Sequence, residues 1–407
     1  RGKRAVVVPA LAAALRRAGK SMNRVLRHTL KCWLAIAAGL ALAGGLFAVF
    51  MAWTGIVNIS ASAGHPAWVE AFLELGMRRS VEQHSSDLVP PDDLRNPDRI
   101  ALGAAHFAGG CAECHGEPGA ERNPIYDYML PVPPDLASAA LDWNAKQLFF
   151  IVRHGLQFTG MPEWSGGERA DEVWSMVALL EELPMLGVDG YRALASGNRD
   201  ARTSVSEEDI GDEGIAQLAR TACDRCHDTP EAAPPSALVP RLAGQPADFI
   251  MRSLREYKRG IRRSGFMQPV AAMLAEPQID ALARYYSTMR RAPAQQVPEV
   301  SLLAAQQPPP QQLPAAQLQE AAAIANGTHP DLRLPACLSC HDRDARTDYP
   351  MLIGQQAPYI AQQLQLFRNG GRNTSAWGDV MTVIAERLGP QHIDSLAQWF
   401  AQQADTE

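Results

Sequence analysis

The sequence predicts a mainly α-helical chain in which one N-terminal transmembrane helix is followed by three small helical modules. Three observations carry this prediction. An almost wholly apolar run covers residues 32–57. Beyond it, the pattern Cys-x-x-Cys-His occurs three times, beside amphipathic patterns of helical period. Polar or Pro-rich stretches at 186–206 and 292–314 separate the three copies, as linkers between modules would.

The N-terminal segment, 1–31, contains nine Arg and Lys and no Asp or Glu. A basic flank stays on the cytoplasmic side of a membrane segment, so we expect 1–31 in the cytoplasm and everything beyond residue 57 in the bacterial periplasm. The apolar run exceeds the roughly 20 residues that cross a bilayer, which predicts a single-pass inner-membrane anchor. Met22, which precedes Arg24, is a candidate start of the protein.

The alternative for the apolar run is a cleaved signal peptide, because Ala61-Ser62-Ala63 resembles a signal-peptidase site. The run is longer than the usual apolar region of about 7 to 15 residues, which favours a retained anchor. Cys32, the one cysteine outside the repeated pattern, lies in this run and is interpreted as a small membrane-facing residue.

The chain beyond the anchor divides into a membrane-proximal connector and three modules. Their predicted ranges are 58–96, 97–185, 207–291 and 315–407. The amphipathic part of the connector, 66–86, fits either a helix at the membrane surface or an ordinary packed helix. In the first module we expect an entry helix over 98–109 and an exit helix over 168–183, which Pro184 and Gly187 should end.

The repeated pattern suits covalent attachment of a c-type haem. Two thiols three positions apart take the two vinyl groups, and the histidine directly after them takes the iron. The predicted attachment residues are Cys111, Cys114, Cys223, Cys226, Cys337 and Cys340, and the predicted iron ligands are His115, His227 and His341. Zinc knuckles and dithiol redox pairs also contain Cys-x-x-Cys, but zinc needs four ligands and a dithiol pair does not require the histidine. Three copies therefore predict three covalently bound haems c.

The second and third modules are an internal duplication. Their attachment cysteines recur at an offset of 114 residues, and so do Met267 and Met381. Residues 242–245 match 352–355 at an offset of 110, so a four-residue deletion is later compensated by an insertion. A thioether opposite the histidine would fill the last iron position and raise the reduction potential. Met267 and Met381 each lie 40 residues beyond the histidine of their module, and we predict them as sixth ligands.

The rival methionines of these two modules, Met273 and Met351, have no counterpart in the sister module. In the first module the predicted sixth ligand is Met161, 46 residues after the histidine, in a loop between Gly and Pro. Met129 is its rival. The remaining histidines of the modules are expected to be structural or exposed: His106, His154, His329 and His392.

Each module also contains a Pro-x-Leu sequence after its pattern, beginning at Pro134, Pro240 and Pro350. A ligand histidine needs its second ring nitrogen held, commonly by a backbone carbonyl. We predict that these prolines supply the carbonyls; the alternative is three unrelated turns, which the recurrence disfavours.

Together these features resemble the class I cytochrome c family. Residues 207–407 are similar to the periplasmic diheme two-domain cytochromes c, including the elements 260–262 and 370–372, Gly-Ile-Arg and Gly-Gly-Arg. Residues 97–185 resemble a third, more divergent module. An anchor with three modules resembles a membrane-anchored triheme cytochrome c subunit of a bacterial dehydrogenase, although such subunits tend to keep their membrane segment at the C-terminus.

The resemblance implies an electron carrier without catalytic residues. It would pass electrons between a dehydrogenase or quinol-oxidising complex and a soluble cytochrome or oxidase. One alternative is a peroxidase-like haem enzyme, which needs an open iron position at the first haem; the other is the cytochrome subunit of a terminal oxidase. The net charge is -6, and without the nine basic residues of 1–31 the remainder carries -15. Such a body has no basic footprint for nucleic acid and favours basic partners.

Overall fold

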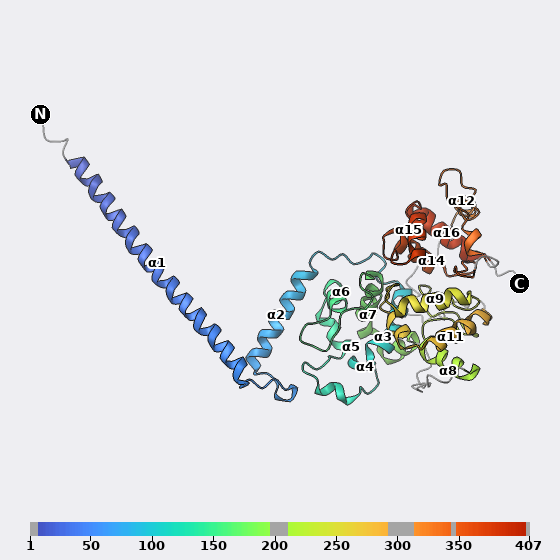
Figure 1. Ribbon diagram of the computed structural model, residues 1–407, viewed down its shortest axis with the longest axis horizontal. Coiled ribbons are helices and arrows are strands. Elements are labelled where there is room, and N and C mark those ends of the chain that lie inside the picture. The colour runs from blue at the N-terminus through green and yellow to red at the C-terminus, as the bar shows by residue number, and fades with distance from the viewer. Residues whose placement is uncertain (1–6, 196–210, 292–312, 343–346, 404–407) are drawn as a thin grey trace. The chain divides into compact units, whose positions relative to one another are not determined.

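A computed structural model describes residues 7–195, 211–291, 313–342 and 347–403 (Figure 1). Most of the predicted linkers 186–206 and 292–314 lies outside the described residues, as does the start of 1–31. The chain forms two compact units, Arg1–His65 and Pro66–Glu407. Within the described ranges the secondary structure is helical and contains no strand. The predicted mainly α fold is therefore confirmed.

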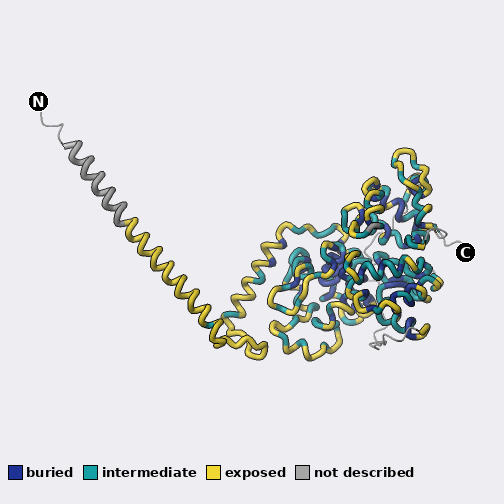
Figure 2. The backbone as a smooth tube through the Cα atoms, in the orientation of Figure 1, coloured by how far each residue is buried: buried dark blue, intermediate teal, exposed yellow. Residues whose placement is uncertain are grey.

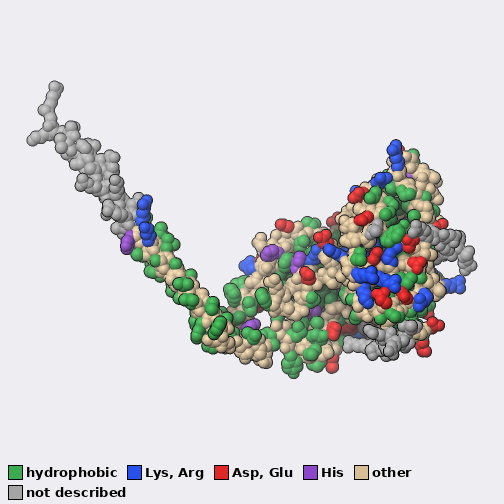
Figure 3. Space-filling model, viewed as in Figure 1, with side chains coloured by type: hydrophobic (Ala, Val, Ile, Leu, Met, Phe, Trp, Pro, Cys, Tyr) green, Lys and Arg blue, Asp and Glu red, His purple; other side chains and the backbone are tan. Residues whose placement is uncertain are grey.

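The N-terminal unit contains one long helix, α1 (Val7–Thr54), followed by a short 3-10 turn, η1 (Ala61–Ala63). The portion Leu26–Thr54 has a mean hydropathy of 2.3, and none of it is buried. In the described chain it is the one helix long and apolar enough to cross a membrane, a test that a signal sequence also passes. Figure 2 shows the described part of this helix as mostly exposed, and Figure 3 shows hydrophobic side chains along it. The side chain of Trp53 is 90% exposed. The predicted run 32–57 thus corresponds to an exposed apolar helix.

The second unit begins with the connector helix α2 (Ala67–Ser85). Its two halves have different surroundings. Trp68 in the first half is 74% exposed, whereas Val81 in the second half is buried. The guanidinium of Arg78 lies 4.9 Å from the ring centre of Trp143 in the first module. The C-terminal half is therefore a packed helix, and the N-terminal half presents apolar side chains to its surroundings.

The first module is built around the crossing of its entry and exit helices. Its helices are α3 (Pro97–Gly110), α4 (Ala112–His115), α5 (Leu136–Ala139), α6 (Ala145–His154) and α7 (Ala170–Leu194), with the turns η2 (Pro124–Tyr128) and η3 (Ala140–Asp142). Asn96 caps α3 by accepting from the Asp98 N–H at 2.9 Å. Where α3 meets α7, a Cβ on Gly103 would lie 2.4 Å from the Ser175 carbonyl oxygen. Only glycine permits this close approach of two helices.

The exit helix runs past the predicted stop at Pro184. It is interrupted at Gly187, as predicted: the φ of this residue is 61°, and a further helical segment then continues to Leu194. Tyr191 of this extension is fully buried, with its ring centre 5.7 Å from that of Phe107. The positive φ lets the chain turn back onto the core. Part of the predicted linker 186–206 therefore packs within the first module.

The second and third modules repeat one arrangement. The second contains α8 (Asp212–Ala222), α9 (Ala247–Lys258), α10 (Met267–Met273) and α11 (Glu276–Thr288); the third contains α12 (Ala315–Ala325), α13 (Leu338–His341), α14 (Ala357–Arg368), α15 (Ala376–Ala385) and α16 (Pro390–Gln402). The Gly244 N–H donates to the Tyr286 carbonyl at 2.9 Å, and the Gly354 N–H donates to the Phe400 carbonyl at 3.0 Å. These residues are equivalent by the 110 and 114 offsets, so the repeat is structural as well as sequential. Each module has its own apolar core.

Candidate haem sites

Each Cys-x-x-Cys-His pattern folds into one helical turn. The histidine N–H donates to the carbonyl of the first cysteine at 3.0 Å in the first module, 2.9 Å in the second and 3.0 Å in the third. This bond joins residues four apart, which places the first thiol and the imidazole on the same side of the turn. The three turns thus offer the same set of donor groups in the same local conformation.

The second ring nitrogen of each pattern histidine is held as predicted. The Nδ1 of His115 lies 2.8 Å from the carbonyl oxygen of Pro134. The corresponding distances are 3.0 Å for His227 and Pro240 and 2.8 Å for His341 and Pro350. The carbonyls fix the proton on Nδ1 and leave Nε2 as the metal-binding nitrogen. Burial lowers the pKa of all three histidines, which favours the neutral imidazole that iron requires.

The surroundings of the cysteines disfavour a zinc site. Burial raises the pKa of Cys111 and Cys223 to about 12 and that of Cys337 to about 11. Zinc binds the thiolate, which such apolar surroundings destabilise, whereas a thioether to haem carries no charge. In the described chain no group of three or more His, Cys, Asp and Glu side chains could hold a metal ion. The donor set therefore fits haem attachment better than a metal cluster.

A single cavity of about 990 Å³ reaches all three patterns. The predicted axial residues line it: His115, Met161, His227, Met267, His341 and Met381. The rival methionines Met129, Met273 and Met351 line it as well. The assignment of the sixth ligands consequently rests on the register of the repeat and on the loops that carry them.

The loop that carries Met161 lies between α6 and α7. Thr159 Oγ accepts from the Met161 N–H at 3.0 Å, and a Cβ on Gly155, whose φ is 62°, would lie 2.5 Å from the Met161 carbonyl. The methyl group of Met129 packs against Gly160, since a Cβ there would lie 2.3 Å from it. The first module therefore brings two thioethers to the same side of its cavity.

Known proteins share these features. The protein-family model for cytochrome c oxidase, cbb3-type, subunit III matches residues 98–180. The chain is 31% identical over 187 residues to the thiosulfate dehydrogenase electron acceptor of Thiomonas intermedia, covering 45% of this chain and 78% of that protein. The chain belongs to the class I c-type cytochromes. Family membership makes it an electron-transfer protein with covalently bound haem c.

Other relatives of this cytochrome are similar over a comparable length. It is 29% identical over 192 residues to the thiosulfate dehydrogenase electron acceptor of Stutzerimonas stutzeri, covering 46% of this chain and 82% of that one. It is 26% identical over 193 residues to cytochrome c4 of Pseudomonas aeruginosa, covering 46% of this chain and 87% of that one. Less than half of the chain is matched in each case.

Two equivalent arginines face the cavity without a protein carboxylate. Arg262 lies 4.6 Å from the ring centre of Tyr257, and Arg372 lies 4.3 Å from that of Phe367. Within the described chain neither forms an ion pair, and Arg262 Nε is buried without a hydrogen-bond partner. Burial and the neighbouring Arg262 lower the pKa of Arg372 to about 9. Two adjacent guanidiniums at an apolar cavity fit a bound anion, and haem propionates supply one.

A reciprocal contact joins the second and third modules beside these sites. Gln245 donates to the Met351 carbonyl at 2.9 Å and accepts from the Met351 N–H at 3.0 Å. Gln355 donates to the Arg241 carbonyl at 3.0 Å and accepts from the Arg241 N–H at 2.9 Å. Arg241 and Met351 are the middle residues of the Pro-x-Leu turns that hold the histidines. The modules thus meet through equivalent residues, as two copies do across a two-fold axis.

The first and second modules also meet at their haem patterns. Arg225, between the two cysteines of the second pattern, packs against Gly109, two residues before Cys111; a Cβ on Gly109 would lie 2.4 Å from its guanidinium. Nearby, the Asp98 carboxylate accepts from the Ala237 N–H at 2.6 Å. The second module therefore contacts both the first and the third close to their predicted haem sites.

The remaining module histidines have other surroundings. His106 is packed between Trp164 and Phe266, with ring centres 5.2 and 4.7 Å away. Burial and the neighbouring Arg225 lower its pKa to about 3, so it is neutral. The other three lie against Phe150 or near Glu320: His154, His329 and His392.

Proposed function

We propose that this cytochrome is a membrane-anchored, periplasmic triheme electron carrier. It takes electrons from a dehydrogenase or quinol-oxidising complex and delivers them to a downstream cytochrome or oxidase. The proposed attachment residues are Cys111, Cys114, Cys223, Cys226, Cys337 and Cys340, and the proposed axial pairs are His115–Met161, His227–Met267 and His341–Met381. The bound haems would supply one-electron chemistry, and the chain sets their spacing and potentials.

The equal geometry of the three patterns is the observation that carries the count of three haems. Each pattern has the same helical turn, and each histidine has its Nδ1 held by a proline carbonyl within 2.8 to 3.0 Å. A dithiol redox pair has no use for such a histidine support, whereas a histidine that binds a metal through Nε2 commonly has it. The raised pKa of Cys111, Cys223 and Cys337 disfavours zinc as that metal. A methionine on the opposite side would close each iron to substrates.

The contacts between modules support a linear path for electrons. The second pattern touches the first through Arg225, and the second and third Pro-x-Leu turns are joined by Gln245 and Gln355. Close approach of the haem-bearing elements suits transfer from one haem to the next. The second haem would therefore relay electrons between the other two.

The proposed donor is a periplasmic dehydrogenase, and two relatives support it by name as electron acceptors of thiosulfate dehydrogenase. The acidic body, at -15 beyond residue 31, favours a partner with a basic surface around its own redox centre. The exposed apolar portion of α1 and the exposed Trp68 of α2 support attachment to the inner membrane.

Haem content and carbon monoxide binding test the proposal together. The full chain, purified in mild detergent, should contain three haems c by pyridine haemochrome assay, and its reduced form should bind no carbon monoxide. Met161→Ala should open one haem, bind one carbon monoxide per chain and lower one reduction potential, since the thioether ligand is lost. Met129→Ala, at the rival methionine, should leave all haems closed. Stoichiometric carbon monoxide binding to the unmodified protein would instead support a haem enzyme.

A further inference from the structure

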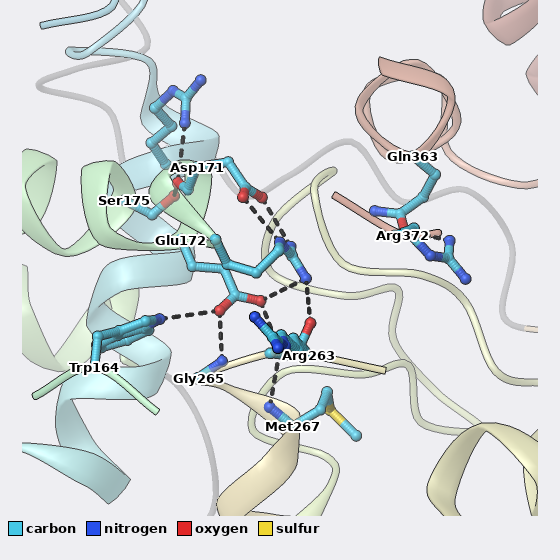
Figure 4. A network of polar contacts seen from close by, with 12 residues as sticks. Trp164, Asp171, Glu172, Ser175, Arg263, Gly265, Met267, Gln363 and Arg372 are labelled. Atoms are coloured by element: carbon cyan, nitrogen blue, oxygen red, sulfur yellow. Dashed lines mark hydrogen bonds and ion pairs between the residues drawn. The ribbon is translucent and has the colours of Figure 1, made fainter. Parts of the chain in front are cut away.

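Three consecutive residues of the second module are held by two side chains of the first (Figure 4). These residues lie shortly before the proposed sixth ligand of the second haem. Arg169 Nη1 donates to the Arg263 carbonyl at 3.0 Å. The Glu172 carboxylate accepts from Ser264 Oγ and from the Gly265 N–H, both at 2.6 Å. Each oxygen of the Glu172 carboxylate thus accepts a hydrogen bond from one of two adjacent residues of the second module.

This contact is buried at the edge of the cavity. Glu172 is 3% exposed and Arg169 is 8% exposed, and they form an ion pair at 2.9 Å. The indole N–H of Trp164 donates to the same Glu172 carboxylate at 3.2 Å. The next residue of the second module, Phe266, packs against Trp164 and His106 at 5.4 and 4.7 Å between ring centres. Four residues in a row, 263–266, are therefore fixed by the first module.

Ser264 transmits this restraint to the proposed ligand. Its hydroxyl oxygen accepts from the Met267 N–H at 3.1 Å, and its carbonyl accepts from the Gln268 N–H at 3.0 Å. These two bonds join Ser264 to the first two residues of the helix that begins at Met267, and the same hydroxyl donates to Glu172. The helix that begins at Met267, α10, has only seven residues, so its first turn is most of its length. A helix this short depends on its surroundings for its position.

The duplicated third module is built differently at this point. Met381 is the sixth residue of α15, a helix of ten residues. Ser375 of the same module caps that helix by accepting from the Gly378 N–H at 3.1 Å. In the first module the Met161 N–H is likewise bonded within its own loop, to Thr159. The segment before Met381 also touches the second module, since Thr374 donates to the Ile261 carbonyl and the Arg252 guanidinium lies 4.9 Å from the ring centre of Trp377. Within the described chain, however, the segment before Met267 is the one that is bonded to a buried carboxylate of another module.

We infer that Glu172 of the first module is a positioning residue for the sixth ligand of the second haem. Methionine ligation in the second module then depends on docking of the first module. This inference rests on the proposed axial pair His227–Met267. Without the Glu172 carboxylate, Ser264 and Gly265 lose their shared acceptor, and the Met267 thioether leaves the iron more readily.

Carbon monoxide binding to the reduced, full-length holoprotein tests the inference. Glu172→Gln keeps the size of the side chain but replaces one acceptor oxygen by an amide group that cannot accept. The reduced Glu172→Gln variant should bind one carbon monoxide per chain. In its oxidised form, the near-infrared absorption band that reports methionine ligation of iron should lose the intensity contributed by one haem. Gly265→Ala changes the second module's side of the contact and should open the same haem, since the added methyl group would lie 2.1 Å from Trp164. Met267→Ala is the reference for a fully open second haem.

Asp98→Ala is the matched control. It removes a half-buried carboxylate of the first module that also accepts from the second at 2.6 Å, but from Ala237 rather than from the segment before Met267. It should leave all haems closed. The inference is overturned if Glu172→Gln and Gly265→Ala stay closed while Met267→Ala opens, or if Asp98→Ala opens the haem to the same extent. A closed Met267→Ala would overturn the ligand assignment, and the inference with it.

Discussion

At the scale of single residues, two arginines that line the cavity carry positive charge that no carboxylate of the described chain neutralises. Arg262 and Arg372 stand at equivalent positions. Within the described chain Arg262 donates to Ser253 and Arg372 donates to Gln363, and neither pairs with a carboxylate. Beside a bound haem these guanidiniums would pair with its propionates and hold positive charge close to the iron. They would therefore favour the arrival of an electron and raise the reduction potential.

Replacing Arg372 should lower a reduction potential. Arg372→Gln removes the charge and should shift one haem by on the order of 60 mV, which corresponds to about 1.4 kcal/mol for one electron and is comparable with a hydrogen bond to a charged group. Potentiometric titration of the holoprotein measures it. Arg368 is an exposed residue of α14, and its charge is screened by solvent. Arg368→Gln removes the same amount of charge and should leave the reduction potentials unchanged. Equal shifts in both variants would contradict a local effect.

At the scale of elements, the crossing of α3 and α7 determines the stability of the first module. Gly103→Ala places a methyl group 2.4 Å from the Ser175 carbonyl and 2.9 Å from Leu179 Cβ. Both neighbours belong to the interior of a helix and cannot move aside separately. The substitution should lower the free energy of unfolding by about 1–3 kcal/mol, the usual cost of overpacking.

Denaturant unfolding of the holoprotein measures this change, and Gly76 in α2 provides the control. A Cβ at Gly76 meets nothing within 4 Å. Gly76→Ala should therefore leave the first module unchanged or stabilise α2 by about 0.5–1 kcal/mol, because alanine loses less backbone entropy in a helix. Destabilisation of similar size in both variants would show that glycine at the crossing has no special role.

The elements and their local bonds could be predicted where one segment contains all the interacting atoms. The proline carbonyls of the Pro-x-Leu turns are an example, because recurrence of the sequence implied recurrence of the contact. The bend at Gly187 could not be predicted, since a Gly that ends a helix and a Gly that redirects one look alike in sequence. The direction of the chain after Gly187 depends on the burial of Tyr191 in the core of the first module.

Contacts between modules lay beyond prediction for a related reason. Glu172 is one acidic residue among several on α7, and nothing in its sequence marks it as the partner of Ser264. Gln245 and Gln355 did carry a signal, because a polar residue recurs in an otherwise apolar turn. That signal identified the repeat but not the fact that each glutamine reaches into the other module.

At the scale of the whole molecule, the proposed anchor should decide where the protein is found. Full-length protein should fractionate with membranes, while a chain beginning at Pro66 behind a cleavable export signal should be soluble and keep its haem content. The reason is that the exposed apolar surface of Leu26–Thr54 is removed. Fractionation with haem staining measures this. If expression of the full-length sequence yields a soluble protein that begins after Ala63, the segment is a cleaved signal.

The glutamine contact between the second and third modules has one more consequence. Each side gives two hydrogen bonds and receives the same two from its counterpart, so the surface is complementary to its own copy. Such a surface would also pair two separate single-module proteins. Joining the two modules in one chain leaves this contact unchanged but raises the effective concentration of each module for the other. The pair therefore forms at any dilution of the protein.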